Sequence, residues 1–490
     1  MERRQRIGIV LGLTLFIVLM IIPEPKGMNP LAMRAAAVSI LMAVFWVTEA
    51  VSIFATSFIP VALFPLLGVL DSKQIASSYG HHIVLLILGA FFVAKAIETN
   101  NLHKRIALST IKAVGTSRRK IMLSFMIATG VLSMWTSNNS TTLMMLPIGM
   151  AILHREKAMG ADISRFAPAL MLCIAYSASI GGTGTLIGTP PNLLFVSTVE
   201  EMFPDAPALV FSDWLKVGIP FVIFFLPISW VYLVKYFKVG GDLEGSSEII
   251  DKEYNDLGSM STAEKRVAII IFFYAMGFIF RNSWSTALGV QSFTKDSTVA
   301  FLASLILFLI PSGRKNEHGQ EIKLLEWEDA KQIPWGISAM IGGGLAIASS
   351  FKSSGLISWV AKSINLEGIP TLLIIIIIVA SMVFLTEINS NTASTAIFLP
   401  VLAGLAKGGG FHPYLLMIPA TLAASCAFML PSGTGPNASV LSSGHLSIPQ
   451  MARVGFGLNL LVIICIVLLL YFVTLPILGI TSEPPSWIGN

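Results

Sequence analysis

Two short clusters of polar residues have the composition of an ion-binding or anion-binding site. Residues 137–142 read Ser-Asn-Asn-Ser-Thr-Thr and residues 390–395 read Ser-Asn-Thr-Ala-Ser-Thr, each inside a long apolar run. Asn and Ser compete for backbone hydrogen bonds, so the clusters predict breaks in membrane helices. A broken helix frees carbonyls that suit a cation such as sodium, and its helix N-termini favour an anion.

The two clusters belong to an internal duplication. Asn138 and Asn391 are 253 residues apart, and both clusters are followed by Pro, at Pro147 and Pro400. Gly-Thr-Pro-Pro-Asn at 188–192 pairs with Gly-Thr-Gly-Pro-Asn at 433–437, offset by 245 residues. These Gly/Pro segments predict a second helix break in each half. Duplication with broken helices is a signature of secondary transporters, which bind their cargo between the repeats.

The composition requires a membrane protein to position these clusters. Of 490 residues, 54% are hydrophobic and 12% are charged, about half the charged share of a soluble domain. The mean hydropathy of +0.78 excludes a soluble enzyme, a disordered chain and a nucleic-acid binder. The charge-free runs predict an all-α polytopic membrane protein with about 11 crossings. Polar stretches at 239–266 and 314–331 divide the chain into two halves.

The charge distribution predicts the orientation. The chain begins Met-Glu-Arg-Arg-Gln-Arg, and a second basic group lies between Lys104 and Lys120. Basic segments stay in the cytoplasm, so we expect a multi-pass protein of the plasma (inner) membrane with a cytoplasmic N-terminus. The net charge of +5 reflects such loops and is no evidence for an anionic partner.

The clusters also carry a family resemblance. The segments Ser-Met-Trp-Thr-Ser-Asn-Asn-Ser-Thr-Thr at 133–142 and Thr-Glu-Ile-Asn-Ser-Asn-Thr at 386–392 resemble the paired Ser-Asn-Thr signatures of the divalent anion:sodium symporter family. The resemblance implies a homodimer of two-domain protomers that works by an elevator mechanism. It also implies two inverted repeats, with re-entrant hairpins near 74–99 and 332–353. The implied domains are scaffold helices at 1–73, first-repeat transport domain at 74–205, scaffold helices at 206–331, and second-repeat transport domain with the last helix at 332–490.

The same resemblance implies the site residues. The first sodium site would use Ser133, Ser137, Asn138 and the carbonyl of Gly188. The second would use Thr386, Asn389, Asn391 and the carbonyl of Gly433. The substrate would meet Asn138, Asn139, Thr189, Asn391, Thr392, Thr434 and Gly435. None of these is Arg or Lys, so bound sodium, helix ends and hydrogen bonds would have to offset the charge of a dianion.

Two positions depart from the family pattern and leave the substrate open. Asn139 replaces the Thr of the first signature, and Gly435 replaces the first Pro of the second Pro-Pro-Asn. The favoured cargo is a C4 dicarboxylate such as succinate, moved with sodium. A sodium-independent dicarboxylate exchanger and a sodium:sulfate symporter remain as alternatives. A passive anion channel differs only in its gating.

Other residues suggest no enzyme and no cofactor beyond sodium as the coupling ion. There is no His-Glu-x-x-His pair and no Walker A sequence. Glu387 is interpreted as a structural acid beside the second sodium site, and Glu98 as a helix-end partner of Lys95. The adjacent residues His81 and His82 would point to different faces of a helix, which argues against a metal site. Three cysteines, Cys173, Cys426 and Cys465, are interpreted as small core residues.

Overall fold

The computed structural model describes residues 3–114, 117–241, 246–363, 368–481 and 483–488. The chain is almost entirely helical, which confirms the predicted all-α class, and the described residues contain one small antiparallel β-hairpin. The first seven elements are α1 (Arg3–Ile21), α2 (Pro30–Thr48), α3 (Ile53–Thr56), α4 (Ile59–Leu66), α5 (Ser72–Tyr79), α6 (His82–Thr99) and α7 (Leu102–Val114).

The remaining elements follow in two sets, one for each half of the chain. The first set is α8 (Arg118–Ser133), α9 (Asn138–Ala158), α10 (Phe166–Gly182), α11 (Pro190–Met202), α12 (Phe211–Tyr236), α13 (Ser246–Asp256), α14 (Thr262–Ile279), α15 (Arg281–Ala287), α16 (Asp296–Leu309), β1 (Pro311–Lys315), β2 (Glu321–Lys323) and α17 (Trp327–Ala330). The second set is α18 (Trp335–Ser353), α19 (Leu356–Ser363), α20 (Thr371–Ile388), α21 (Asn391–Gly409), α22 (Pro413–Ala424), α23 (Gly435–Leu441), α24 (Ile448–Leu469), η1 (Leu470–Thr474), α25 (Leu475–Leu478) and η2 (Ser486–Ile488).

The first polar cluster lies at the tip of a helical hairpin. Ser117 and Ser137 cap α8 and α9 by accepting hydrogen bonds from the backbone amides of Lys120 and Ser140. The far ends of the two helices meet again, because Arg118 forms an ion pair of 2.8 Å with Glu156. The chain therefore enters along α8, turns at 134–137 and returns along α9.

The second polar cluster lies at an equivalent turn. α20 ends at Ile388 and α21 begins at Asn391, 253 residues after the first residue of α9. α22 packs against both α20 and α21, as α10 packs against both α8 and α9. The expected placement of the hairpins near 74–99 and 332–353 is wrong. α5 and α6 form one membrane-length span over Ser72–Thr99, and α18 is an unbroken helix.

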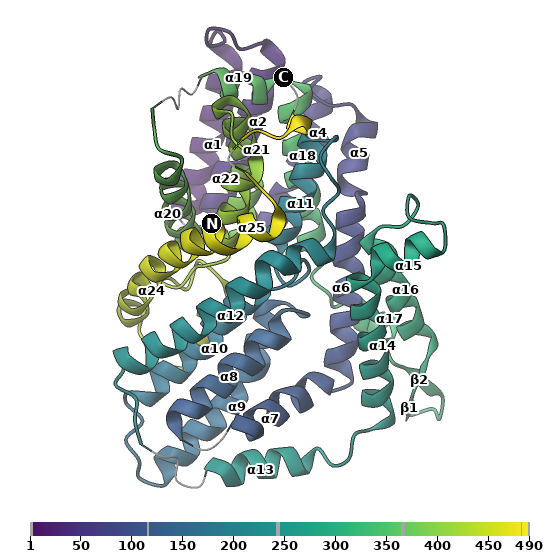
Figure 1. Ribbon diagram of the computed structural model, residues 1–490, viewed down its shortest axis with the longest axis vertical. Coiled ribbons are helices and arrows are strands. Elements are labelled where there is room, and N and C mark those ends of the chain that lie inside the picture. Colours follow the sequence, from purple (N-terminus) through teal and green to yellow (C-terminus); the bar gives the residue numbers. More distant parts are fainter. Residues whose placement is uncertain (1–2, 115–116, 242–245, 364–367, 482, 489–490) are drawn as a thin grey trace.

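The predicted second break occurs in each half. α10 ends at Gly182 and α11 begins at Pro190, while α22 ends at Ala424 and α23 begins at Gly435. All residues of α10 and of α22 are buried, so these broken helices form the centre of the molecule. The repeats are interlocked: α11 packs against α21, and α23 packs against α9. In Figure 1, α8–α10 lie in the lower part of the view and α20–α22 in the upper part.

The outer helices present apolar side chains outward, as a membrane protein requires. Among the described residues, six helices have the length and composition of membrane spans, or seven if the pair α14–α15, bent by 79°, is one span. Four shorter apolar helical segments include the buried α10 and α22. The count of about 11 crossings stays a prediction, as do the domain boundaries.

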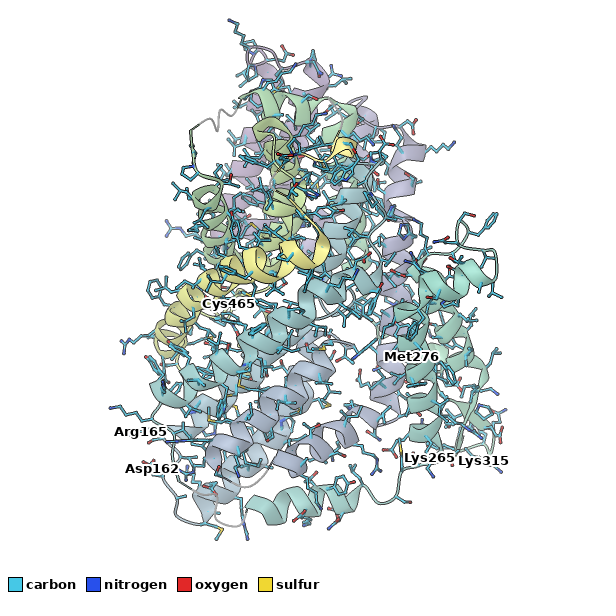
Figure 2. The ribbon with its side chains drawn as sticks, viewed as in Figure 1. Asp162, Arg165, Lys265, Met276, Lys315 and Cys465 are labelled. Carbon is cyan, nitrogen blue, oxygen red and sulfur yellow. The ribbon has the colours of Figure 1, made fainter. Side chains whose placement is uncertain are left out.

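Charged residues from several loops and element ends gather at one end of the molecule. Asp162, Arg165, Lys265 and Lys315 lie at the lower end of the view, away from the apolar middle (Figure 2). Part of the polar stretch at 239–266 lies there as α13, although its residues 242–245 are outside the described part. Cys173, Cys426 and Cys465 are buried free thiols, which confirms their interpretation as core residues.

Candidate functional site

The first hairpin tip places hydroxyl, amide and carbonyl groups around one point. Ser133 Oγ lies 2.6 Å from Asn138 Oδ1 and 2.7 Å from the carbonyl oxygen of Ala178 in α10. The Asn138 amide fills the space beside Gly182, where a Cβ atom would collide with it. Gly188 also lies against Gly182, at its carbonyl. The tip of one hairpin and the break between α10 and α11 therefore meet at Gly182.

The second tip repeats this arrangement. Thr386 Oγ1 lies 2.6 Å from Asn391 Oδ1 and 2.8 Å from the carbonyl oxygen of Ala424 in α22. The Asn391 amide also lies 3.2 Å from the carbonyl oxygen of Gly433. Thr386 corresponds to Ser133, and Asn391 to Asn138, in both sequence offset and contact. The predicted pairs of sodium ligands are thus adjacent in both halves.

The chemistry of these two clusters suits a hard cation. When the Asn391 amide turns its oxygen toward Ala424 and Gly433, three oxygens converge beside the Thr386 hydroxyl. Converging oxygens repel one another unless a cation lies among them, and carbonyls of unwound helix ends are typical sodium ligands. When the amide turns its nitrogen the same way, it donates to those carbonyls instead.

Two of the predicted sodium ligands point elsewhere in the structure. The Ser137 hydroxyl donates to Ser140 Oγ at 2.8 Å and caps α9. The Asn389 amide donates to Ser394 Oγ, while its oxygen accepts from the amide of Ser390. The described contacts therefore give both side chains a role in holding the turns, not in the oxygen clusters.

Each helix break is held by an asparagine to which the sequence analysis gave no role. Asn192 Nδ2 donates to the carbonyls of Gly182 at 3.2 Å and Thr185 at 2.7 Å. Asn437 Nδ2 donates to those of Ala427 and Leu430, both at 3.0 Å. Both asparagines are buried and belong to the duplicated Gly/Pro segments. The sequence feature that could have predicted this role is the Asn repeated at the fifth position of each Gly/Pro segment.

Glu387 ties the second break to its hairpin. Its carboxylate accepts hydrogen bonds from the backbone amides of Phe428, Met429 and Leu430 and from Asn459 Nδ2, at 2.7 to 3.0 Å. These amides lead directly to Gly433. The interpretation of Glu387 as a structural acid beside the second cluster is confirmed.

The predicted substrate residues lie at the starts of four helices. Thr189 and Thr434 immediately precede α11 and α23, with similar extended backbone angles. Asn139 and Thr392 lie in the first turns of α9 and α21. Asn139 reaches across the repeats to Gly435, and Ser439 Oγ donates to its Oδ1 at 3.1 Å. Asn139 and Gly435 are exposed, whereas Thr189 and Thr392 are buried.

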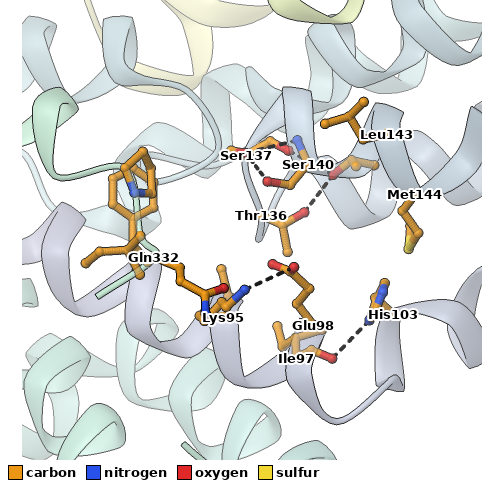
Figure 3. Close-up of a pocket in the computed structure, with 15 residues that line it drawn as sticks. Lys95, Ile97, Glu98, His103, Thr136, Ser137, Ser140, Leu143, Met144 and Gln332 are labelled. Atoms are coloured by element: carbon orange, nitrogen blue, oxygen red, sulfur yellow. Dashed lines mark hydrogen bonds and ion pairs between the residues drawn. The ribbon is translucent and has the colours of Figure 1, made fainter. Parts of the chain in front are cut away.

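A cavity of about 400 Å³ opens beside the first tip. Thr136, Ser137 and Ser140 line one wall, and the Lys95–Glu98 ion pair of 3.2 Å lies on the opposite wall, as expected for Glu98 (Figure 3). Burial lowers the pKa of His103, which also lines the cavity. The sequence analysis missed this cavity because its walls come from segments far apart in the chain.

Two interlocked repeats, with polar hairpin tips facing broken helices inside an apolar bundle, are the arrangement of a secondary transporter. The chain belongs to the family defined by the sodium:sulfate symporter transmembrane region, whose model matches residues 4–478. This confirms the resemblance to divalent anion:sodium symporters.

Two sodium-dependent dicarboxylate transporters are similar to this chain over almost its whole length. The sodium-dependent dicarboxylate transporter SdcS of Staphylococcus saprophyticus is 40% identical, over 98% of this chain and 93% of the relative. SdcS of Staphylococcus aureus has the same identity and coverage.

Solved structures show the same fold at low identity. The Alcanivorax borkumensis YdaH transporter superposes with a TM-score of 0.61 at 11% identity, over all of both chains. Neisseria gonorrhoeae MtrF gives a TM-score of 0.57 at 10% identity, over 96% of this chain and 94% of that chain.

Proposed function

We propose that the protein transports a C4 dicarboxylate of the succinate type by symport with sodium across the plasma membrane. The observation that carries the proposal is the duplicated oxygen cluster, Ser133 with Asn138 and Thr386 with Asn391. The 40% identity to sodium-dependent dicarboxylate transporters supports the choice of cargo. The proposed cycle uses sodium as the coupling ion and no further cofactor.

Sodium dependence follows from the charge balance of the site. The proposed substrate residues offer hydroxyls, amides and backbone groups but no cationic side chain. The N-termini of α9, α11 and α21 supply partial positive charge. Two bound sodium ions would supply the rest, because a dianion in the membrane interior needs its charge compensated. Substrate binding without sodium is therefore strongly disfavoured.

The proposed route to the cytoplasm begins at the cavity beside the first tip. That cavity shares His103 and Met144 with a second cavity lined by Lys104 and Glu253. Basic residues follow from Lys104 onward, and basic segments face the cytoplasm. We therefore propose that the described conformation is inward-facing and that the basic N-terminus also lies inside. We propose an elevator movement in a homodimer for the return to the outside.

Uptake of radiolabelled succinate into proteoliposomes tests the proposal. We expect uptake with an inward sodium gradient and none with choline in its place. Uptake without sodium that depends on preloaded dicarboxylate would make the protein an exchanger and overturn the coupling. Uptake of sulfate but not succinate under the sodium gradient would overturn the cargo while leaving the sodium clusters in place.

A further inference from the structure

A cluster of metal-ligating side chains lies away from the substrate and sodium residues. His81 Nε2 and His82 Nε2 lie 3.8 Å and 2.8 Å from the same carboxylate oxygen, Glu200 Oε2. The three side chains are about one-fifth exposed, so they are neither free in solvent nor sealed in the core. Among the described residues, this is the one group of three or more His, Cys, Asp or Glu side chains close enough to hold an ion.

The expectation that adjacent histidines must diverge is wrong here. His81 precedes α6 as its N-cap, with extended backbone angles, and only His82 is helical. The two rings therefore lie with their centroids 4.4 Å apart and face Glu200 together. Glu200 lies in the last turn of α11. The ligands come from two elements that are more than 100 residues apart in the chain.

We propose that His81, His82 and Glu200 form a binding site for a divalent transition-metal ion of the Zn²⁺ class. Two imidazole nitrogens and one carboxylate oxygen are the ligand set of many zinc sites that leave a fourth position open to water. Ligand atoms on a tetrahedral zinc are about 3.3 Å apart, given metal–ligand distances of about 2.0–2.1 Å. The two histidine–glutamate separations, 2.8 Å and 3.8 Å, bracket that value, and all three ligand atoms lie within 4.8 Å of one another.

One ring nitrogen of the cluster has no hydrogen-bond partner, and a nearby lysine competes for Glu200. His82 Nδ1 is buried and has no hydrogen-bond partner, although His82 Nε2 bonds to Glu200. Lys295 Nζ lies 3.8 Å from Glu200 Oε1, whereas both histidine contacts are to Oε2. The lysine is half exposed and can move into solvent when a cation binds at the other oxygen. It is thus a competitor for Glu200 that does not block the ligand positions.

A metal ion at this cluster would affect transport, because the cluster links helices with different neighbours. The three ligands all lie in the segment 74–205 predicted as transport domain, but their helices have different neighbours. α6 packs against α16 in the predicted scaffold segment 206–331, whereas α11 packs against α21 and α22, which carry part of the proposed substrate and sodium sites. A metal ion would tether the end of α11 to the start of α6 (Figure 1). His82 and Thr99 are the two ends of α6, roughly 25 Å apart, so the cluster lies at the end opposite the basic residues from Lys104 onward. On the proposed orientation, which rests on the proposed function, it faces the outside.

Metal binding is measured first, because it does not depend on transport. Zn²⁺ is titrated calorimetrically into the full-length protein, purified without a histidine tag, and Co²⁺ absorption spectra report the coordination. We expect one Zn²⁺ per chain. His82→Asn and Glu200→Gln should each lower the affinity at least about tenfold, since even outer-shell changes at zinc sites cost about 10–100-fold. His318→Asn, at an exposed turn, is the matched control and should bind as the wild type does.

A variant that improves binding separates the site from a folding defect. Lys295→Gln removes the competing cation, so it should tighten Zn²⁺ binding several-fold. Equal Zn²⁺ affinity in the wild type, His82→Asn, Glu200→Gln and Lys295→Gln proteins would overturn the site. Fewer bound Zn²⁺ ions per chain in the His318→Asn variant would also overturn the site, because His318 would then be a ligand.

The transport consequence is tested separately on sodium-driven succinate uptake. External Zn²⁺ should inhibit the wild type, and chelation should restore it, while Glu200→Gln should transport and resist Zn²⁺. If no variant and no wild type took up succinate, the proposed function would be wrong. The metal site would be unaffected, because Zn²⁺ binding is measured by calorimetry without transport. Zn²⁺ binding with undiminished uptake would overturn the tether.

Discussion

Asn139 and Gly435 lie against each other across the two repeats. A Cβ atom added at Gly435 would lie 2.8 Å from Asn139 Oδ1 and 3.0 Å from its Cγ, closer than side chains normally approach. These are the two positions at which the sequence departs from the family signatures. The longer side chain of Asn139 therefore reaches into space that the missing side chain at Gly435 leaves open. The two departures are one coupled change at the surface where substrate is proposed to bind.

Gly435→Ala should therefore weaken succinate binding through Asn139. Overpacking costs about 1–3 kcal/mol in well-packed sites, but Asn139 is exposed and can move aside. We expect a KM for succinate raised about tenfold, which corresponds to about 1.4 kcal/mol, with little change in melting temperature. The double variant Asn139→Thr with Gly435→Ala should regain most of the wild-type KM. An unchanged KM for succinate in Gly435→Ala would contradict the proposed coupling between Asn139 and Gly435.

Asn138→Ala and Asn391→Ala should each abolish uptake in protein that remains folded. Each removes the amide at the centre of an oxygen cluster. In the wild type, sodium binding should raise the melting temperature, because a ligand at 100 times its Kd stabilises the folded state by about 2.7 kcal/mol. That sodium-dependent increase should shrink in both variants when melting in sodium is compared with melting in choline.

Asn282→Ala is the matched control for these two variants, since Asn282 is exposed on α15 and outside both clusters. It should retain uptake and the full sodium-dependent increase in melting temperature. Wild-type uptake in Asn138→Ala or Asn391→Ala would contradict the site.

Gly182→Ala should mimic the loss of Asn138 without removing it. The added Cβ would overlap the Asn138 amide and force it away from Ser133 and the Ala178 carbonyl. We expect sodium-driven uptake to fall at least about tenfold, which corresponds to about 1.4 kcal/mol. Gly149→Ala is the control, because its Cβ would lie 3.0 Å from the flexible end of Ile174. Equal uptake by Gly182→Ala and Gly149→Ala would contradict the prediction, because the Asn138 amide would then tolerate a Cβ atom at position 182.

The sequence was sufficient to predict the duplicated elements of the site but not their three-dimensional form. The repeated Ser-Asn clusters and Gly/Pro breaks follow directly from residue types that cap or interrupt helices. Whether a polar cluster in a long apolar run marks a straight broken helix or a hairpin tip depends on where the far ends meet. The Arg118–Glu156 ion pair, which joins residues 38 apart, supplies that information only in the structure.

Side-chain direction was the second limit of the sequence. Ser137 and Asn389 match the expected positions of sodium ligands, yet their side chains bond to Ser140 and Ser394 within their own turns. Pairing between repeats is equally hidden, because Asn139 and Gly435 are nearly 300 residues apart and nothing local in either segment indicates the contact. The two adjacent histidines were misjudged for a related reason: the start of α6 falls between them.

Glu387→Gln should destabilise the protein and weaken sodium binding together. The carboxylate accepts from three successive backbone amides and from Asn459. A glutamine amide would direct its NH₂ group at some of these donors and leave buried amides unpaired, at a cost of about 1–3 kcal/mol. Because the segment from Phe428 to Leu430 leads to Gly433, its loosening also displaces a carbonyl of the second cluster.

Thermal unfolding and the sodium dependence of uptake measure the two effects of Glu387→Gln. Glu98→Gln is the control for unfolding, because Glu98 is half exposed beside Lys95 and such surface pairs contribute about 0–1 kcal/mol. We expect a clear fall in melting temperature and a raised sodium requirement for Glu387→Gln alone. A stable variant with normal sodium activation would mean that the amides of 428–430 hold their positions without the carboxylate, and that the second cluster is organised by the Thr386 and Asn437 hydrogen bonds instead.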